Sequence, residues 1–129
     1  MIDWLEILGW KEEQLEDLRF VGYSYIKQGK YDVALPFFEA LAVLSPQNPY
    51  DQQMLGAIYL QMGNNLMALN AIEKALKLDP LHSPTLLNRT KALFALGYKR
   101  QALAQARQLE KSAELPIADQ AAALLLAYS

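Results

Sequence analysis

The sequence predicts an all-α protein, a solenoid of three helix-turn-helix hairpins with a short N-terminal helix and a C-terminal capping helix. The first indication is a period: Gly29, Gly63 and Gly97 follow one another at intervals of 34 residues. The second is an apolar pattern at helical spacing on both sides of each of these glycines. Because neither helix of one hairpin buries its apolar face alone, each hairpin needs copies of itself beside it.

Small residues recur with the same period. Gly22 and Gly56 are 34 residues apart, and so are the alanines at 34, 68 and 102. We expect these residues to let the two helices of a hairpin approach closely. A helical hairpin of this length, with small residues, aromatics and a closing proline, resembles the tetratricopeptide repeat. The third copy is degraded, since Arg89 and Thr90 stand where Leu55 and Gly56 stand in the second.

The repeats account for most of the chain, so we expect a single tetratricopeptide-repeat domain over residues 1–129. Asn48 and Ser83 each precede a proline, the pairing expected of an N-cap residue and the first helical position. A closing helix is predicted from Ile117, Ala121 and Tyr128, which share one helix face. The predicted segments are an N-terminal arm at 1–10, repeats at about 15–48, 49–82 and 83–116, and a C-terminal helix at 117–128.

The N-terminal arm carries Trp4, Leu5 and Leu8 at helical spacing before Gly9. Terminal surfaces of a solenoid need a cover, so one role for this arm is to cap the first hairpin. The other role is a contact with another subunit, and the sequence leaves both open.

Composition excludes several classes of function. The net charge is −2 and the pI near 5.3, which gives no reason to expect nucleic acid or an anionic membrane as a partner. There is no cysteine, so disulfides and thiolate metal sites are excluded. Asp3 stands where a signal peptide would carry lysine, and the longest apolar run, 121–128, is far shorter than a membrane span. We therefore expect a cytoplasmic protein without membrane insertion.

Catalytic chemistry is not expected. A nucleophile needs a positioned base, and the single histidine, His82, lies in a predicted surface loop. No cluster of metal-ligating residues and no phosphate-binding glycine motif is visible. We expect no enzyme activity, no metal and no cofactor.

A partner-binding surface is expected instead. In a tetratricopeptide stack the first helix of each hairpin lines the concave face, and Arg19 is one of the residues that spacing places there. The residues predicted to bind a partner are mostly apolar, which favours a groove for a foreign chain. The other reading is that a terminal helix fills the groove, or that these side chains belong to the core. The predicted partner-binding set is Phe20, Tyr23, Ile26, Tyr50, Met54, Ala57, Leu60, Leu87, Lys91 and Phe94.

The same positions bear on the chemistry of the ligand. Many tetratricopeptide co-chaperones clamp a C-terminal carboxylate with lysines and asparagines from these helices. Tyr23 and Ala57 occupy the places where that clamp would put asparagine. An apolar ligand segment is therefore expected.

A narrower resemblance covers roughly residues 11–111. The stretches 29–34 and 37–46, with their run Phe38-Glu39-Ala40-Leu41, and the stretch 55–63 resemble the bacterial type III secretion chaperones. This resemblance implies a chaperone that works without ATP and holds an aggregation-prone secretion substrate until export. The implied partner is a needle subunit or a translocator, with room for a small helical co-chaperone or for a homodimer.

Two main functions remain open on these grounds, and a third, weaker alternative is an accessory domain of an enzyme. The first is a type III secretion chaperone that binds an apolar or amphipathic segment of a secretion substrate in its concave groove. The second is a tetratricopeptide scaffold, a permanent subunit of a larger assembly.

Overall fold

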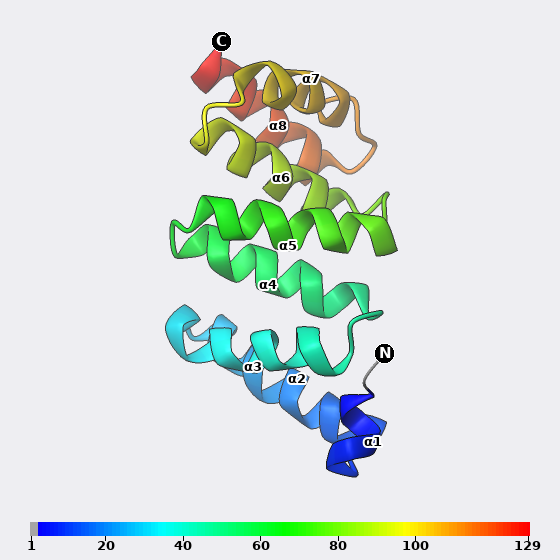
Figure 1. Ribbon diagram of the computed structural model, residues 1–129. Coiled ribbons are helices and arrows are strands. Elements are labelled where there is room, and N and C mark those ends of the chain that lie inside the picture. The colour runs from blue at the N-terminus through cyan, green and yellow to red at the C-terminus, as the bar shows by residue number, and fades with distance from the viewer. Residues whose placement is uncertain (1–2) are drawn as a thin grey trace.

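The computed structural model describes residues 3–129, which form helices joined by short turns (Figure 1). The predicted arm contains a short helix, α1, and each predicted hairpin is present. The helices are α1 (Trp4–Leu8), α2 (Glu12–Lys27), α3 (Tyr31–Leu44), α4 (Pro49–Gln61), α5 (Asn65–Leu78), α6 (Ser83–Ala95), α7 (Lys99–Leu109) and α8 (Leu115–Tyr128).

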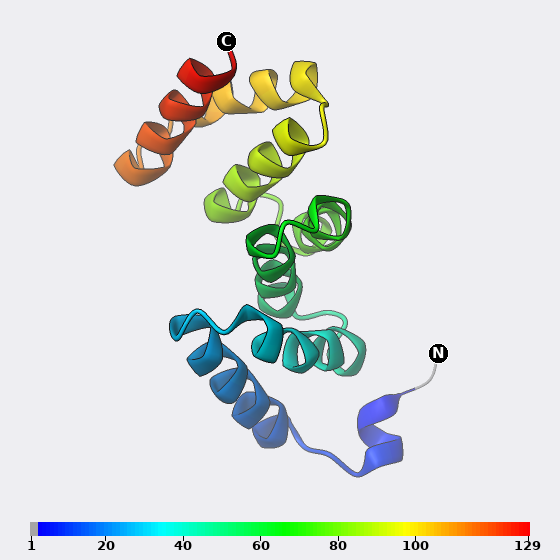
Figure 2. The same cartoon turned by 90° about the vertical axis from the view of Figure 1, so that its left-hand side faces the viewer.

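The hairpins α2–α3, α4–α5 and α6–α7 stack in chain order. In Figure 2, α2, α4, α6 and α8 lie on one side and α3, α5 and α7 on the other. On the first side α4 is set back relative to α2 and α8, so this side is concave. The expected all-α solenoid of helical hairpins is confirmed.

Close contact within the hairpins depends on glycine at two positions. A Cβ atom on Gly22 would lie 2.7 Å from Cε2 of Phe38, and one on Gly56 would lie 2.7 Å from Cγ1 of Ile72. Real Cβ contacts are not this short, so any larger residue would push the hairpin apart. In the third repeat Thr90 replaces the glycine and is completely buried, where its hydroxyl donates to the Leu86 carbonyl at 2.9 Å.

One of the two predicted helix caps is confirmed. The side chain of Asn48 accepts a hydrogen bond from the Tyr50 backbone N–H at 2.9 Å, and Pro49 is the first residue of α4. The prediction for Ser83 is wrong, because α6 already begins at Ser83 and its N-cap residue is His82. Ser83 instead donates from Oγ to Glu114 at 3.2 Å, which links the start of α6 to the start of α8.

The N-terminal helix α1 contacts α3 and ends at Leu8, and the next residue, Gly9, has a φ of 68° in the left-handed region. Figure 2 shows it on the α3 side of the stack, away from the concave face. Trp4, Ile7 and Leu8 remain exposed there. Met1 and Ile2, also assigned to the arm, lie outside the described residues.

Candidate partner-binding groove

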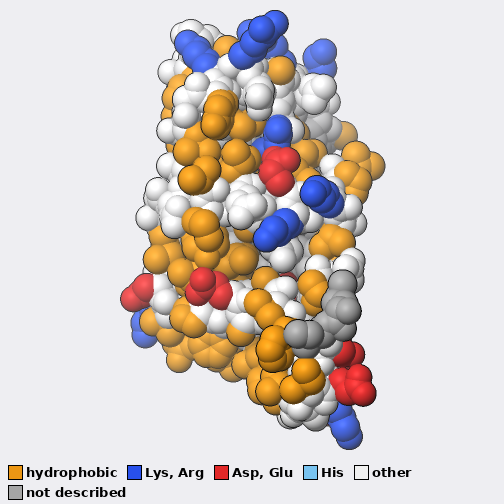
Figure 3. Space-filling view, viewed as in Figure 1, with side chains coloured by type: hydrophobic (Ala, Val, Ile, Leu, Met, Phe, Trp, Pro, Cys, Tyr) orange, Lys and Arg blue, Asp and Glu red, His pale blue; other side chains and the backbone are white. Residues whose placement is uncertain are grey.

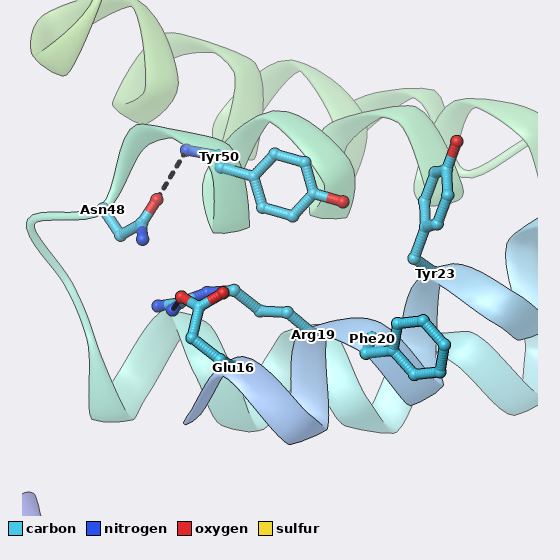
Figure 4. Close-up of a pocket in the computed structure, with 6 residues that line it drawn as sticks. All are labelled: Glu16, Arg19, Phe20, Tyr23, Asn48 and Tyr50. Atoms are coloured by element: carbon cyan, nitrogen blue, oxygen red, sulfur yellow. Dashed lines mark hydrogen bonds and ion pairs between the residues drawn. The ribbon is translucent and has the colours of Figure 1, made fainter. Parts of the chain in front are cut away.

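A hollow of about 380 Å³ lies between α2 and α4. These two helices face the concave side of the stack, and α2 contributes four of the lining side chains (Figures 2 and 4). We call this place the α2–α4 hollow. It is lined by Glu16, Arg19, Phe20, Tyr23, Asn48 and Tyr50.

The wall of the α2–α4 hollow is largely aromatic. Phe20 is 73% exposed and Tyr23 is 44% exposed, although both are large apolar side chains. The ring of Tyr50 extends across the hollow toward Tyr23 (Figure 4) and packs edge-on against Phe38 of α3, with 6.2 Å between ring centroids. The ammonium group of Lys27 lies 5.8 Å from the centre of the Tyr23 ring. The hollow thus offers apolar surface that the described part of the chain leaves uncovered.

Arg19, which lines the hollow, is held in a buried ion pair with Asp51. Arg19 donates from Nε and Nη2 to the two carboxylate oxygens of Asp51, each at 2.8 Å. Asp51 is fully buried and Arg19 is 5% exposed. Nη1 of Arg19 also donates to Glu12 at 3.2 Å and to Glu16. The placement of Arg19 on the open face is therefore wrong, because a carboxylate 32 residues away draws it into the interface between two repeats.

The electrostatic environment follows from these contacts. The hydrogen bond to Asp51 raises the pKa of Arg19 above its ordinary value, so the guanidinium stays charged although it is buried. Partial burial raises the pKa of Tyr50, so its phenol stays neutral at physiological pH. The hollow therefore presents a neutral aromatic wall, and beneath it the charge of Arg19 is already compensated by that of Asp51.

The remaining predicted residues of α2 and α4 lie deeper than Phe20 and Tyr23. Ile26, Met54 and Leu60 are half-buried and pack against the main hydrophobic core. Ala57 is also half-buried. Of the predicted residues, the structure therefore brings Phe20, Tyr23 and Tyr50 together at the hollow, and Ile26, Met54, Ala57 and Leu60 are not part of its lining.

The predicted residues of α6 behave differently, because α8 covers this helix. Leu87 and Phe94 are 3% and 7% exposed, so the prediction that they are open to a partner is wrong. Leu87 packs with Ile117 and Ala121 of α8. The ring of Phe94 stacks on that of Tyr128, with 4.1 Å between centroids.

The C-terminal helix packs against α6 and α7 much as α6 packs against α4 and α5. It therefore continues the stack and closes the third repeat, as expected of a capping helix. Lys91 of α6 stays half-buried and donates to Gln120 of α8 at 3.4 Å. Of the predicted partner-binding residues, the exposed ones are thus Phe20 and Tyr23 of the first repeat, and none of those on α6 is exposed.

Two residues of the hollow were not predicted. Glu16 was assigned to a charged helix start, and Asn48 to a cap. Both assignments follow from local sequence, whereas their place in the hollow depends on how α2 and α4 cross. Within residues 3–129, no cluster of metal-ligating side chains occurs, and no helix is long and apolar enough to cross a membrane.

The family of this chain is shown by the match of a family model to its repeats. Residues 27–109, more than half of the chain, match the family model described as anaphase-promoting complex, cyclosome, subunit 3. The chain belongs to this family. No curated protein matches the chain by sequence.

Solved structures share the fold along nearly the whole chain. PcrH in complex with the chaperone-binding region of PopD is 24% identical, with a TM-score of 0.83 over 93% of this chain and 94% of that one. The Yersinia enterocolitica type III secretion chaperone SycD, in complex with a peptide of the translocator YopD, is 22% identical, with a TM-score of 0.81 over 92% and 94%.

A third structure with this fold binds a different kind of ligand. The first tetratricopeptide domain of Spaghetti (RPAP3), bound to the HSP90 peptide SRMEEVD, is 22% identical, with a TM-score of 0.79 over 92% of each chain. At these identities the likeness establishes the tetratricopeptide fold, which the secretion chaperones and the HSP90-binding domain have in common.

Proposed function

We propose that this protein is a type III secretion chaperone that holds an apolar or amphipathic segment of a secretion substrate in its concave groove. The observation that carries the proposal is the exposure of Phe20 and Tyr23 on the concave face, beside Tyr50. When a partner covers exposed apolar surface, the free energy of the complex falls by roughly 25 cal/mol per Å² of surface removed from water. A hollow with such walls fits a foreign apolar side chain.

The proposed contact lies on α2 and α4. Phe20, Tyr23 and Tyr50 would provide the accessible surface, with Ile26, Met54, Ala57 and Leu60 beneath them. Contact through Leu87 or Phe94 would require α8 to move off α6, so we place the substrate on the first two repeats. A specific interface covers roughly 800 Å² per partner, so the hollow would form its centre rather than its whole extent.

The mechanism is passive shielding in the cytoplasm. A needle subunit or a translocator exposes apolar side chains that would otherwise drive self-association. Covering them in the groove lowers the concentration of the aggregation-prone form, and competition or the export apparatus would then release the substrate. The complexes of PcrH with a PopD region and of SycD with a YopD peptide support this role, because both have the same fold.

The test is co-purification from the native host followed by identification of small bound proteins. Phe20→Asp combined with Tyr23→Asp should leave the helical content unchanged and reduce recovery of the bound protein at least tenfold. Recovery equal to that of the unaltered chain would overturn the proposed contact.

The control uses apolar side chains that are equally open on the opposite side of the stack. Figure 3 shows hydrophobic side chains across that face, and Val43 of α3 and Leu66 of α5 are 58% and 67% exposed. Val43→Asp with Leu66→Asp should leave co-purification unchanged. An equal loss in both double variants would indicate a general effect of added charge instead of a contact in the groove.

A second candidate function is a permanent scaffold subunit. The family description, a subunit of the anaphase-promoting complex, is what favours it. The two functions differ in exchange: a chaperone releases its partner within the time of export, whereas a scaffold keeps it. A pulse-chase measurement of the bound protein separates them, since a partner that stays bound through the chase supports the scaffold.

A further inference from the structure

The α2–α4 hollow has a charged rim that bears on the ligand. Glu12, Glu16, Arg19, Tyr23 and Lys27 follow one another at intervals of three or four residues along α2, so they share one helix face. The acidic residues lie at one end of this stripe, the aromatic surface lies in the middle, and Lys27 lies at the far end. The stripe spans about 22 Å, the length of roughly seven residues of extended chain.

The acidic end carries more negative charge than its arginine can match. One guanidinium, that of Arg19, contacts three carboxylates, those of Glu12, Glu16 and Asp51, which leaves a net charge of −2 for the four groups. Asp51 is fully buried and takes two of the hydrogen bonds of Arg19. The side chains of Glu12 and Glu16 are 68% and 63% exposed, so both still face solvent and any bound chain.

This distribution disfavours an acidic ligand. A carboxylate placed beside Phe20 would lie near Glu16, one turn earlier on the same helix, and Arg19 is already paired with Asp51. A lysine or arginine in the same place would gain an ion pair with Glu12 or Glu16 at the solvent-exposed rim. The apolar wall next to it would take an aliphatic or aromatic side chain.

Building on the proposed function, we propose that the groove selects segments carrying a basic residue two or three residues from an apolar anchor. The basic residue binds Glu12 and Glu16, and the anchor packs between Phe20, Tyr23 and Tyr50. Acidic segments, such as the HSP90 peptide bound by a domain of the same fold, are rejected.

A phage-displayed library of random 12-residue peptides tests this without assuming a sequence. Selection on the unaltered chain should enrich peptides that combine an apolar residue with a nearby Lys or Arg and lack Asp and Glu. Enrichment of apolar peptides with no charge preference would overturn the charge inference alone. If the unaltered chain and the Phe20→Asp variant enrich the same peptides to the same extent, the proposed groove is overturned as well.

Binding measurements on one enriched peptide, labelled with fluorescein, sharpen the result. Replacing its basic residue by Glu should weaken binding about tenfold at low ionic strength, and the difference should shrink in 0.5 M salt because screening shortens the reach of exposed charges. Glu12→Gln with Glu16→Gln should abolish the preference for the basic peptide. Glu110→Gln with Glu114→Gln, which removes the same charge at the other end of the stack, should preserve it. A preference retained in the first double variant contradicts the proposal.

Discussion

Arg19 of α2 and Asp51 of α4 form a bidentate ion pair in the interface between the first and second repeats, with both nitrogen–oxygen distances at 2.8 Å. Asp51 has no exposed surface, and Arg19 is the only ionic partner that the described structure gives it. Because the two residues come from neighbouring repeats, the pair fixes the position of α2 relative to α4. The shape of the α2–α4 hollow therefore depends on a contact 32 residues apart in sequence.

Breaking this pair should be more costly than replacing it. Arg19→Met leaves Asp51 buried without its cation and should lower the free energy of unfolding by about 3–5 kcal/mol. The double variant Arg19→Met, Asp51→Leu should recover most of that loss, because no buried charge remains. Urea unfolding followed by circular dichroism measures both. A double variant as unstable as the single one would contradict this view of the pair.

The close packing at Gly22 should make even a methyl group unfavourable. Gly22→Ala places a Cβ 2.7 Å from the ring of Phe38, which is fully buried and cannot move aside. The clash should cost more than the helix gains from alanine, for a net loss of about 1–3 kcal/mol. Adding Phe38→Leu should reduce the penalty of Gly22→Ala, and thermal unfolding of the four variants provides the comparison. Equal penalties in both backgrounds would show that the ring is not the cause.

Tyr59 should make the fold sensitive to alkali. Burial, together with the hydrogen bond that its hydroxyl donates to Glu39 at 3.0 Å, raises the pKa of Tyr59 in the folded state. The neutral phenol is favoured by folding, so its stabilisation is complete below the unfolded pKa of about 10 and is lost as the pH rises above it.

The measurement is the free energy of unfolding in urea between pH 8 and pH 11. Tyr59→Phe should lose about 1 kcal/mol at pH 8 and should show a smaller further loss toward pH 11 than the unaltered chain. Tyr98→Phe, at a position that is 52% exposed, should follow the unaltered chain. Identical pH profiles for Tyr59→Phe and the unaltered chain would contradict the assignment.

The stack of Phe94 on Tyr128 should fasten the end of α8 to the third repeat. The two rings lie 10° from parallel with 4.1 Å between centroids. A double-mutant cycle with Phe94→Ala and Tyr128→Ala should give a coupling of about 1 kcal/mol. Leu126→Ala, at a position 84% exposed on the same helix, should change stability by less than about 0.5 kcal/mol. A coupling near zero would mean that the stack does not hold α8.

The local sequence was sufficient to predict the helices and several of the contacts between them. The 34-residue period predicts the three hairpins, and glycine at position 22, which has no Cβ, predicts a close approach of the partner helix. The structure shows that Phe38 makes this approach. Asn48 before Pro49 predicts the start of α4. The same rule applied to Ser83 before Pro84 gave a wrong prediction for the start of α6. The cap position depends on the backbone conformation of one residue, which a Ser-Pro pair does not specify.

The sequence by itself determined that this chain forms helical hairpins and that they must stack, because periodicity and small residues act over one turn or one repeat. Only the tertiary structure decided which of the predicted concave residues face solvent. Phe94 and Phe20 are both aromatic residues on the predicted concave face, yet α8 buries the first and leaves the second 73% exposed. The exposure of these side chains depends on the angle between successive repeats and on which helix covers the last repeat. Many contacts between residues far apart in the chain together determine both.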